Sequence, residues 1–500
     1  MKPQQLFTLG APPPEPECDF VRRVRASLPA LGAIAVAIAS SIVLTLGGCA
    51  SSAGIASTAQ TLAPVNVGLD ASVAVPAVTR DWWHSFGDPA LNGLVERALA
   101  DNPSLKVAQA RLARAQAAVA GAQAADGPQV NGSLDVTRQR FSANSIYPPP
   151  LGGGIFTLGT AQIGGSWEID FFGRNRAAIE AAVGAQRAAQ ADAQAARIVL
   201  ASNVARTYVQ LGRLFEQREV AARALKQRDE TLALIRQRVQ GGLDTNVELR
   251  QGEGALPETR QAIEQLDEQI ALGRHALAAL TAQPPNALGA LTVRLGSVQA
   301  VPLPAAVPAD LLGRRADIAA ARWRVEAATA DMKSAKAQFY PNVNLTAFVG
   351  LSSIGLDRLV KSGSEQYGAG PAIHLPIFDS GRLRANLSAK AADRDAAVES
   401  YNAAVLDAVH DVADQIGSMR SIARQQLEQV SAQAAAESAY DLATQRYKAG
   451  LGTYLTVLNA ESNVLTQRRL SADLKARAID IQIALIRSLG GGYTNPGDLS

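Results

Sequence analysis

The feature that most constrains this chain is a pair of very long segments without proline. They run from Arg174 to about Gln240 and from Arg382 to about Lys448, and both are rich in alanine, the best helix former. At about 1.5 Å per residue, each would form a helix of about 100 Å. Helices of globular proteins rarely exceed about 20 residues, so these must pack as in coiled coils or stack end to end. The chain therefore favours one elongated architecture over several compact domains.

Both long segments belong to an internal duplication. Gly173-Arg174 matches Gly381-Arg382, and Gly242-Leu243 matches Gly450-Leu451, both at an offset of 208 residues. Arg111 and Pro128 match Arg324 and Pro341 at an offset of 213 residues, and a loop between Pro128 and Gly173 can absorb the difference. Three landmarks matched in order make chance similarity a poor explanation.

Each repeat is expected to hold a helix, two strands, a long helix that ends at glycine, and a returning helix. The first helices are expected from Pro89 to about Ala125 and from Ala309 to about Phe339, and Asp88-Pro89 is a good helix start. The returning helices are expected at about 246–282 and 454–489, and Pro257 is expected to interrupt the earlier one. The sequence thus predicts repeats at 89–290 and 310–490, a linker at 291–309 and a C-terminal tail at 491–500.

Four runs of alternating apolar residues predict strands at about 129–141, 156–172, 342–352 and 366–378. Alternation over about ten residues is typical of outer-membrane barrel strands, although half-buried hairpins give the same pattern. Barrels start at about eight strands, and an open sheet edge is not tolerated in lipid. If the strands span a membrane, several copies of the chain must each contribute four.

The first 48 residues resemble a bacterial lipoprotein signal peptide. A basic cluster at 21–25 precedes an apolar stretch, Ala26 to Leu46, that ends in Leu46-Gly47-Gly48-Cys49. The resemblance implies cleavage before Cys49 and a covalent lipid on that cysteine, with Ala50 permitting sorting to the outer membrane. Residues 49–88 would then form a lipidated N-terminal tether. An uncleaved membrane anchor is the alternative, because about 21 apolar residues can span a bilayer.

Composition excludes several classes of protein. With 48 basic and 45 acidic residues, the net charge of +3 argues against nucleic-acid binding. The two cysteines, Cys18 and Cys49, exclude a disulfide framework and a cysteine zinc site. Asp407, His410, Asp411 and Asp414 have helical spacing that could hold a metal, but a solvated helix face is the favoured interpretation. No catalytic constellation stands out, so we expect no enzyme, no metal and no cofactor beyond the lipid on Cys49.

Three further motifs carry a resemblance to a known family. They are Asp81-Trp-Trp-His-Ser-Phe-Gly-Asp-Pro-Ala-Leu91, Asp310-Leu-Leu-Gly-Arg-Arg-Ala-Asp-Ile318 and Ala337-Gln-Phe-Tyr-Pro341. With the lipoprotein signal, the duplication and the glycine turns, they resemble the outer membrane factor family of TolC-like channels, and within it the NodT-type lipoproteins of RND efflux systems. Ala316 stands where that group has proline. The resemblance covers about Cys49 to Gly492.

The resemblance implies a mainly α-helical protein with a membrane β-barrel. It implies a homotrimer in which a twelve-stranded barrel, in the outer membrane of a Gram-negative bacterium, continues as an α-helical tunnel across the periplasm. The partners implied are a periplasmic adaptor, an inner-membrane RND transporter and outer-membrane lipid. The function implied is a passive exit duct for small molecules. A TolC-like duct for protein secretion and a lipid-anchored periplasmic coiled-coil scaffold remain alternatives.

The two glycine turns match the adaptor-docking tips of that family. The docking residues carried over are Gly242, Leu243, Thr245, Gly450, Leu451, Gly452 and Thr453, although plain helix C-caps explain the glycines too. At the periplasmic gate, family channels often have Asp-Val-Leu-Asp where this chain has Thr456-Val457-Leu458-Asn459. Asp244 and Glu248 could supply acidic rings instead, with pKa values raised by like charges in a trimer. A solvated acidic turn is the alternative.

Overall fold

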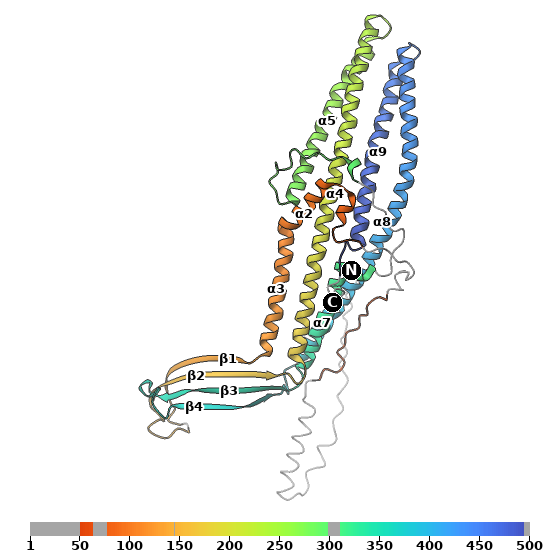
Figure 1. The fold of residues 1–500 in the computed structure, drawn as a ribbon. Coiled ribbons are helices and arrows are strands. Elements are labelled where there is room, and N and C mark those ends of the chain that lie inside the picture. Colours follow the sequence, from red (N-terminus) through yellow and green to blue (C-terminus); the bar gives the residue numbers. More distant parts are fainter. Residues whose placement is uncertain (1–50, 64–77, 145, 299–310, 495–500) are drawn as a thin grey trace, which may run out of the picture.

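The computed structural model describes residues 51–63, 78–144, 146–298 and 311–494. Figure 1 shows a long helical body with a four-stranded sheet projecting from one end and the turns of the helical hairpins at the other. The described helices hold no segment that is both long enough and apolar enough to cross a membrane.

The first repeat begins with η2 (Trp82–Phe86), α2 (Pro89–Asp101) and α3 (Pro103–Asp126). Strands β1 (Gln129–Arg140) and β2 (Ile155–Ile169) follow. The helical hairpin consists of α4 (Arg174–Gln240) and α5 (Asn246–Leu280), and η3 (Leu295–Ser297) comes after it. The second repeat contains α6 (Leu311–Arg314), α7 (Ala316–Ala337), β3 (Asn342–Ile354), η4 (Leu356–Arg358), β4 (Glu365–His374), α8 (Arg382–Lys448) and α9 (Tyr454–Ser488).

The long helices α4 and α8 have the bounds expected from the sequence, but other elements differ. The single helix expected from Pro89 is two helices, because Asn102 adopts an extended conformation before Pro103 and caps α3. The expected interruption at Pro257 is wrong, since α5 runs through it. β2 and β4 end at Ile169 and His374 rather than at 172 and 378, because the chain turns there to enter α4 and α8.

The four strands form one antiparallel sheet in the order β1-β2-β3-β4, so the two repeats meet at β2 and β3. Directly opposed residues share a face. One face carries apolar residues, among them Val130, Leu134, Ile163, Trp167, Leu345, Val349, Tyr367 and Ile373. The other face carries mainly polar residues, among them Asn131, Asp135, Gln162, Ser166, Asn344, Thr346, Gln366 and His374. The register therefore places most of the apolar side chains on one face and most of the polar side chains on the other.

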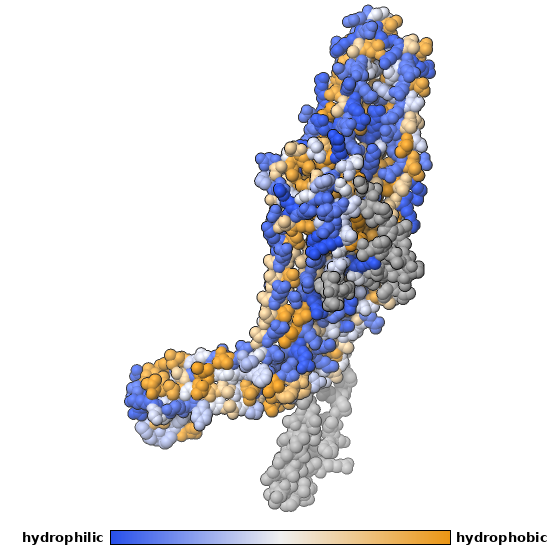
Figure 2. Space-filling model, in the orientation of Figure 1, coloured by the Kyte–Doolittle hydropathy of each residue, from blue (hydrophilic) through white to orange (hydrophobic). Residues whose placement is uncertain are grey.

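The apolar face is exposed to solvent in a single chain. Val130 is 70% exposed and Ile373 is 71% exposed, although both are large and apolar. Figure 2 shows apolar side chains gathered on the projecting sheet, whereas much of the helical body is hydrophilic. Trp167 lies near the helical end of this face and Tyr367 near the loop end. Aromatic residues at both ends of an apolar band are typical of membrane barrels.

The main hydrophobic core lies midway along the helical body. It joins Trp83 and Phe86 of η2 with residues of α2, α4, α5 and α9. The prediction of a tether as far as residue 88 is therefore wrong for its last part, because bulky aromatic side chains there bury themselves in the core. The start of the expected linker is also folded, since Leu295 is buried in the same core. The start of the expected tail packs as well, because Gly491 is buried and its amide donates to the carbonyl of Ile486 at 2.9 Å.

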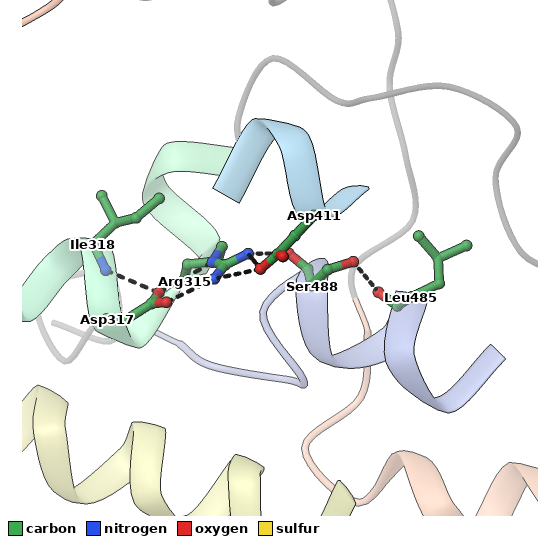
Figure 3. A network of polar contacts seen from close by, with 6 residues as sticks. All are labelled: Arg315, Asp317, Ile318, Asp411, Leu485 and Ser488. Carbon is green, nitrogen blue, oxygen red and sulfur yellow. Dashed lines mark hydrogen bonds and ion pairs between the residues drawn. The ribbon is translucent and has the colours of Figure 1, made fainter. Parts of the chain in front are cut away.

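A polar network joins the start of α7 to the middle of α8 and to the end of α9. Arg315 forms ion pairs with Asp317 (2.7 Å) and with Asp411 of α8 (3.4 Å). Its guanidinium also donates to the carbonyl oxygen of Ser488, at the end of α9 (Figure 3). Arg315 therefore ties three helices of the second repeat together.

Candidate functional site

The two hairpin tips have almost the same backbone. Gly242 and Gly450 have φ values of 69° and 75°, in the left-handed region that favours glycine. The amide of Leu243 donates to the carbonyl of Arg238 at 2.8 Å, and the amide of Leu451 donates to that of Arg446 at 2.8 Å. Each turn thereby satisfies a carbonyl at the end of its long helix.

Each turn also presents a leucine to solvent at the same position. Leu243 is 69% exposed and Leu451 is 70% exposed. Both residues were among those predicted to dock an adaptor, and the structure places them at equivalent points of the two turns. Together with the glycines, which leave backbone accessible, they form a surface that another protein could contact closely.

At the first tip, Asp244 is held by two other residues. Arg238 forms an ion pair with it, with Nε at 2.9 Å from Oδ2 and Nη2 at 3.2 Å from Oδ1. Tyr447, at the end of α8, donates its hydroxyl to the same carboxylate. The guanidinium of Arg238 also lies over the ring of Tyr447, 4.6 Å from its centroid. The triad Arg238–Asp244–Tyr447 thus links the first hairpin to the second.

These contacts set the ionisation of the tip. Burial opposes the charge on Asp244, but the hydrogen bonds from Arg238 and Tyr447 outweigh it and lower the pKa of Asp244. Burial and the neighbouring carboxylate raise the pKa of Tyr447, so its hydroxyl stays protonated. The predicted acidic ring stays a prediction, and within one chain the charge of Asp244 is already balanced by Arg238.

Glu248 is engaged in the helix start of α5. Its carboxylate accepts the amide of Thr245 at 3.0 Å, while the Thr245 hydroxyl accepts the amide of Val247 at 3.1 Å, which completes a capping box. The hydroxyl and the amide of Thr245 lower the pKa of Glu248. Thr245, one of the predicted docking residues, therefore has a structural role in the turn.

The second tip has no carboxylate in the corresponding turn. Gly452 and Thr453 occupy the positions of Asp244 and Thr245, and the Thr453 hydroxyl lies 3.1 Å from that of Thr456. Thr456 and Asn459, the other predicted gate residues, are exposed on α9. The gate assignment of Asp244, Glu248, Thr456 and Asn459 stays a prediction.

A separate hydrophobic cluster lies beneath the tips. Ile235 of α4 packs with Tyr447 of α8 and with Tyr454 and Val457 of α9. Gly252 of α5 leaves room for this packing, because a Cβ there would lie 3.1 Å from the side chain of Ile235. The four helix ends therefore share a small core of their own.

Below this cluster is a buried ion pair that sequence reasoning missed. Arg228 Nε of α4 lies 3.1 Å from both carboxylate oxygens of Glu461 of α9, which is 6% exposed. Arg228 also donates to Thr259 Oγ1 at 2.8 Å and to the Ala255 carbonyl at 3.1 Å, beside the proline in α5. Burial raises the pKa of Glu461, and Arg228 opposes this. The available signal was the spacing of Glu461 with Val457 and Val464 on one buried face of α9.

The remaining predicted residues lie elsewhere. Asp407, His410 and Asp414 are exposed on α8, and Asp411 binds Arg315. Within residues 51–63, 78–144, 146–298 and 311–494, no group of three His, Cys, Asp or Glu side chains could hold a metal ion. The proposed lipid site Cys49 lies outside the described residues.

The chain matches the family model "Outer membrane efflux protein" at residues 94–283 and 307–491. It is 32% identical to the putative multidrug resistance outer membrane protein MdtQ of Escherichia coli K12 over 466 residues, 90% of this chain and 97% of that protein. It is 31% identical to the pyoverdine export outer membrane protein OpmQ of Pseudomonas aeruginosa over 418 residues, 83% of this chain and 88% of that protein.

Solved structures agree with these relationships. The outer membrane protein VceC of Vibrio cholerae has a TM-score of 0.79 and 36% sequence identity, over 83% of this chain and all of that one. The outer-membrane channel OprN has a TM-score of 0.78 and 28% identity, over 89% of this chain and 98% of that one. On sequence and fold together, the chain belongs to the outer membrane efflux protein family and is an efflux channel of the bacterial outer membrane, with its helical part in the periplasm.

Proposed function

We propose that three copies of this chain form a passive exit duct, in which a twelve-stranded barrel crosses the outer membrane and the helices line a tunnel in the periplasm. The amphipathic four-stranded sheet carries this proposal. β1 and β4 each pair on one side only within the described residues. Unpaired edges and an exposed apolar face are both costly in lipid, and joining β4 of one copy to β1 of the next removes the edges.

The helices support the same assembly. α4 is covered by other helices of its own chain, whereas α8 has many fewer buried residues along the same length. Leu427 and Val430 of α8 are 72% and 70% exposed and lie one turn apart. Apolar side chains in such a row are typical of a helix that packs on a neighbour. The neighbour we propose is a second copy of this chain.

The partners follow from the family resemblance and from the tips. We propose that a periplasmic adaptor docks at the turns around Gly242 and Gly450 and connects the duct to an inner-membrane RND transporter. The exposed Leu243 and Leu451 would be the principal contacts. The cargo we propose is small organic molecules, because MdtQ is named for multidrug resistance and OpmQ for pyoverdine export. A lipid on Cys49 would anchor the mature chain.

The first experiment is to extract the protein in mild detergent, measure the mass of its oligomer and record conductance in planar bilayers. We expect a trimer with pore currents. A monomer that removal of the lipid anchor alone releases from membranes would overturn the duct and leave a scaffold. Currents combined with secretion of a protein cargo would overturn the small-molecule assignment.

A matched pair of variants tests the two faces of the sheet. Val349→Arg adds a charge to the apolar face, where a cation at the bilayer midplane costs about 2–4 kcal/mol. Thr346→Arg adds the same charge to the polar face of the same strand. We expect Val349→Arg to prevent membrane insertion, and Thr346→Arg to insert with altered conductance. Equal insertion of both variants would contradict a lipid-facing apolar side.

A further inference from the structure

Residues 51–63 lie along the first part of α8, with Ser51 nearest the sheet (Figure 1). Near the start of α8, the guanidinium of Arg384 donates to the carbonyls of Ser51 and Ala53. Further along, the Asn402 side chain donates to the carbonyl of Gln60 at 3.0 Å and accepts the amide of Leu62 at 2.9 Å. The segment is thus bonded through its backbone at both ends.

Between these two points, one carboxylate gathers three donors. Asp395 accepts the amides of Thr58 at 3.0 Å and of Ala59 at 2.9 Å, and also the hydroxyl of Ser57. The neighbouring Arg394 donates to the same hydroxyl. Charge-assisted bonds of this kind are stronger than neutral ones, so Asp395 is the strongest single attachment of the segment.

The attachments form one line along the helix. Arg384, Asp395 and Asn402 are spaced by 11 and 7 residues, which correspond to about three and two helical turns. Asn402 is only 7% exposed, and the segment supplies partners to both its amide nitrogen and its oxygen. The amide nitrogen also donates to Glu399 at 3.1 Å, so both polar atoms of the Asn402 side chain form hydrogen bonds. α8 therefore offers the segment three polar attachment points in a line.

We propose that residues 51–63 are a docked strap, held on α8 by Arg384, Asp395 and Asn402, that fixes where the lipid-bearing N-terminus enters the membrane. The inference rests on the proposed lipid on Cys49. Only two residue steps separate Ser51 from Cys49, and a chain advances at most about 3.6 Å per residue. A strap that holds Ser51 therefore keeps the proposed lipid close to the start of α8.

The position of the strap suggests what fixing the lipid-bearing N-terminus achieves. Arg384, which binds Ser51, lies in the first turn of α8, and that helix follows β4. Among the described residues β4 is an outer strand of the sheet, and in the proposed barrel a neighbouring copy pairs with its edge. A lipid held beside this point places the edge at the membrane surface before the barrel closes. The strap then speeds assembly of the barrel.

The test compares Asp395→Ala with Asp393→Ala in the full-length chain. Asp393 lies on the same helix but is exposed and pairs only weakly with Lys390, at 3.5 Å. Hydrogen exchange of the purified protein should show at least about tenfold faster exchange of the Thr58 and Ala59 amides in Asp395→Ala, and no change in Asp393→Ala. Asp395→Asn, which keeps an acceptor oxygen, should lie between them. Equal exchange in Asp395→Ala and the unmodified chain would overturn the docking.

A second measurement tests the role in assembly. After pulse labelling, Asp395→Ala should enter the outer membrane as oligomers several-fold more slowly, with unchanged conductance once inserted. In a Cys49→Ser background, Asp395→Ala should add no further delay. A delay that persists without Cys49, or no delay in the lipidated chain, would overturn the proposal that the strap positions the lipid during assembly. Labelling with palmitate separates the two claims, because an unlabelled chain refutes the lipid anchor while the exchange result still judges the strap.

Discussion

Arg238 at the first hairpin tip and Arg446 at the second occupy equivalent positions, 208 residues apart. Arg238 binds the carboxylate of Asp244, whereas Arg446 has Gly452 at the corresponding position and donates to the carbonyl of Leu451 at 3.3 Å. The backbones of the two turns are nevertheless almost the same. Duplication has therefore kept the features that the turn requires, its glycine and its carbonyl bonds, while the side chains around it have diverged.

The same relationship holds at the opposite end of the hairpins. In the first repeat, the Asn102 side chain donates to the carbonyl of Leu280, the last residue of α5, at 2.8 Å. In the second repeat, Arg315 donates to the carbonyl of Ser488, the last residue of α9, at 3.3 Å. These residues match at offsets of 213 and 208. The first contact, or joint, between a helix start and the end of a returning helix thus uses a neutral amide. The second joint uses a guanidinium that also reaches Asp411 of α8.

The largest difference between the repeats concerns Glu461 and its counterpart Glu253. Glu461 is buried and paired with Arg228, whereas Glu253 pairs with Arg250, which is 80% exposed, on the surface of α5. We expect Glu461→Gln to lower the free energy of unfolding by about 3–5 kcal/mol, because it leaves a buried guanidinium without a counter-charge. Glu253→Gln should cost less than about 1 kcal/mol. Denaturant titration in detergent measures both.

A double variant separates loss of the pair from loss of packing. Arg228→Met with Glu461→Leu replaces both charges with apolar side chains, so it should be less damaging than Glu461→Gln alone. If the double variant were the more damaging one, the pair itself would be the source of stability. Equal effects of Glu461→Gln and Glu253→Gln would mean that burial does not distinguish the repeats here.

The second prediction concerns the two joints. Arg315→Ala should lower the free energy of unfolding by about 3 kcal/mol, because it removes bonds to three helices and leaves the Ser488 carbonyl unpaired. Asn102→Ala removes an N-cap and one bond to Leu280, which should cost about 1–2 kcal/mol. The same titration measures both variants, and a larger effect of Asn102→Ala would reverse the comparison.

Much of the fold could be predicted because the signals were local. The absence of proline within the two long segments and the glycines at 241–242 and 450 indicated the bounds of α4 and α8. The alternation of apolar residues indicated the positions of all four strands. The tip backbone followed from the need for a left-handed residue at Gly242 and Gly450. Each of these features depends on residues that are close in the sequence.

What could not be predicted depends on contacts between distant residues. Nothing near Asp244 indicates that Tyr447, 203 residues later, donates to it. The same holds for Arg228 with Glu461, and for Asp395 with the strap. The helix α5 was expected to break at Pro257, but it continues through this residue while it packs against α4. Tertiary contacts decided these points, and a single sequence does not display them.

The third prediction addresses the charged tip. Asp244→Asn should destabilise the protein by about 2 kcal/mol at neutral pH, because it weakens two hydrogen bonds to a carboxylate. The folded-state pKa of Asp244 is lowered, so its contribution is complete above the ordinary aspartate value of about 4 and is lost as pH falls through the folded pKa. The difference between the variant and the unmodified protein should therefore be constant from pH 7 to about pH 5 and shrink below about pH 4. A difference that disappears near pH 6 would show that another group controls the tip.

The smallest expected effect comes from making the second tip resemble the first. Gly452 does not have a positive φ, and a Cβ there would meet the Arg446 Cβ at an ordinary 3.5 Å, so an aspartate fits. Gly452→Asp should supply Arg446 with the partner that Arg238 has and stabilise the protein by less than about 1 kcal/mol, since the Arg446 side chain is exposed. Gly452→Asn is the matched control, with the same shape and no charge. A gain in the aspartate variant that high salt removes, and that the asparagine variant lacks, would show that the charge pair can be transferred between the repeats. An equal response of both variants would mean that the first tip depends on Tyr447, which has no counterpart at the end of α4, where Val239 stands, and that a shared backbone is not enough to transfer its chemistry.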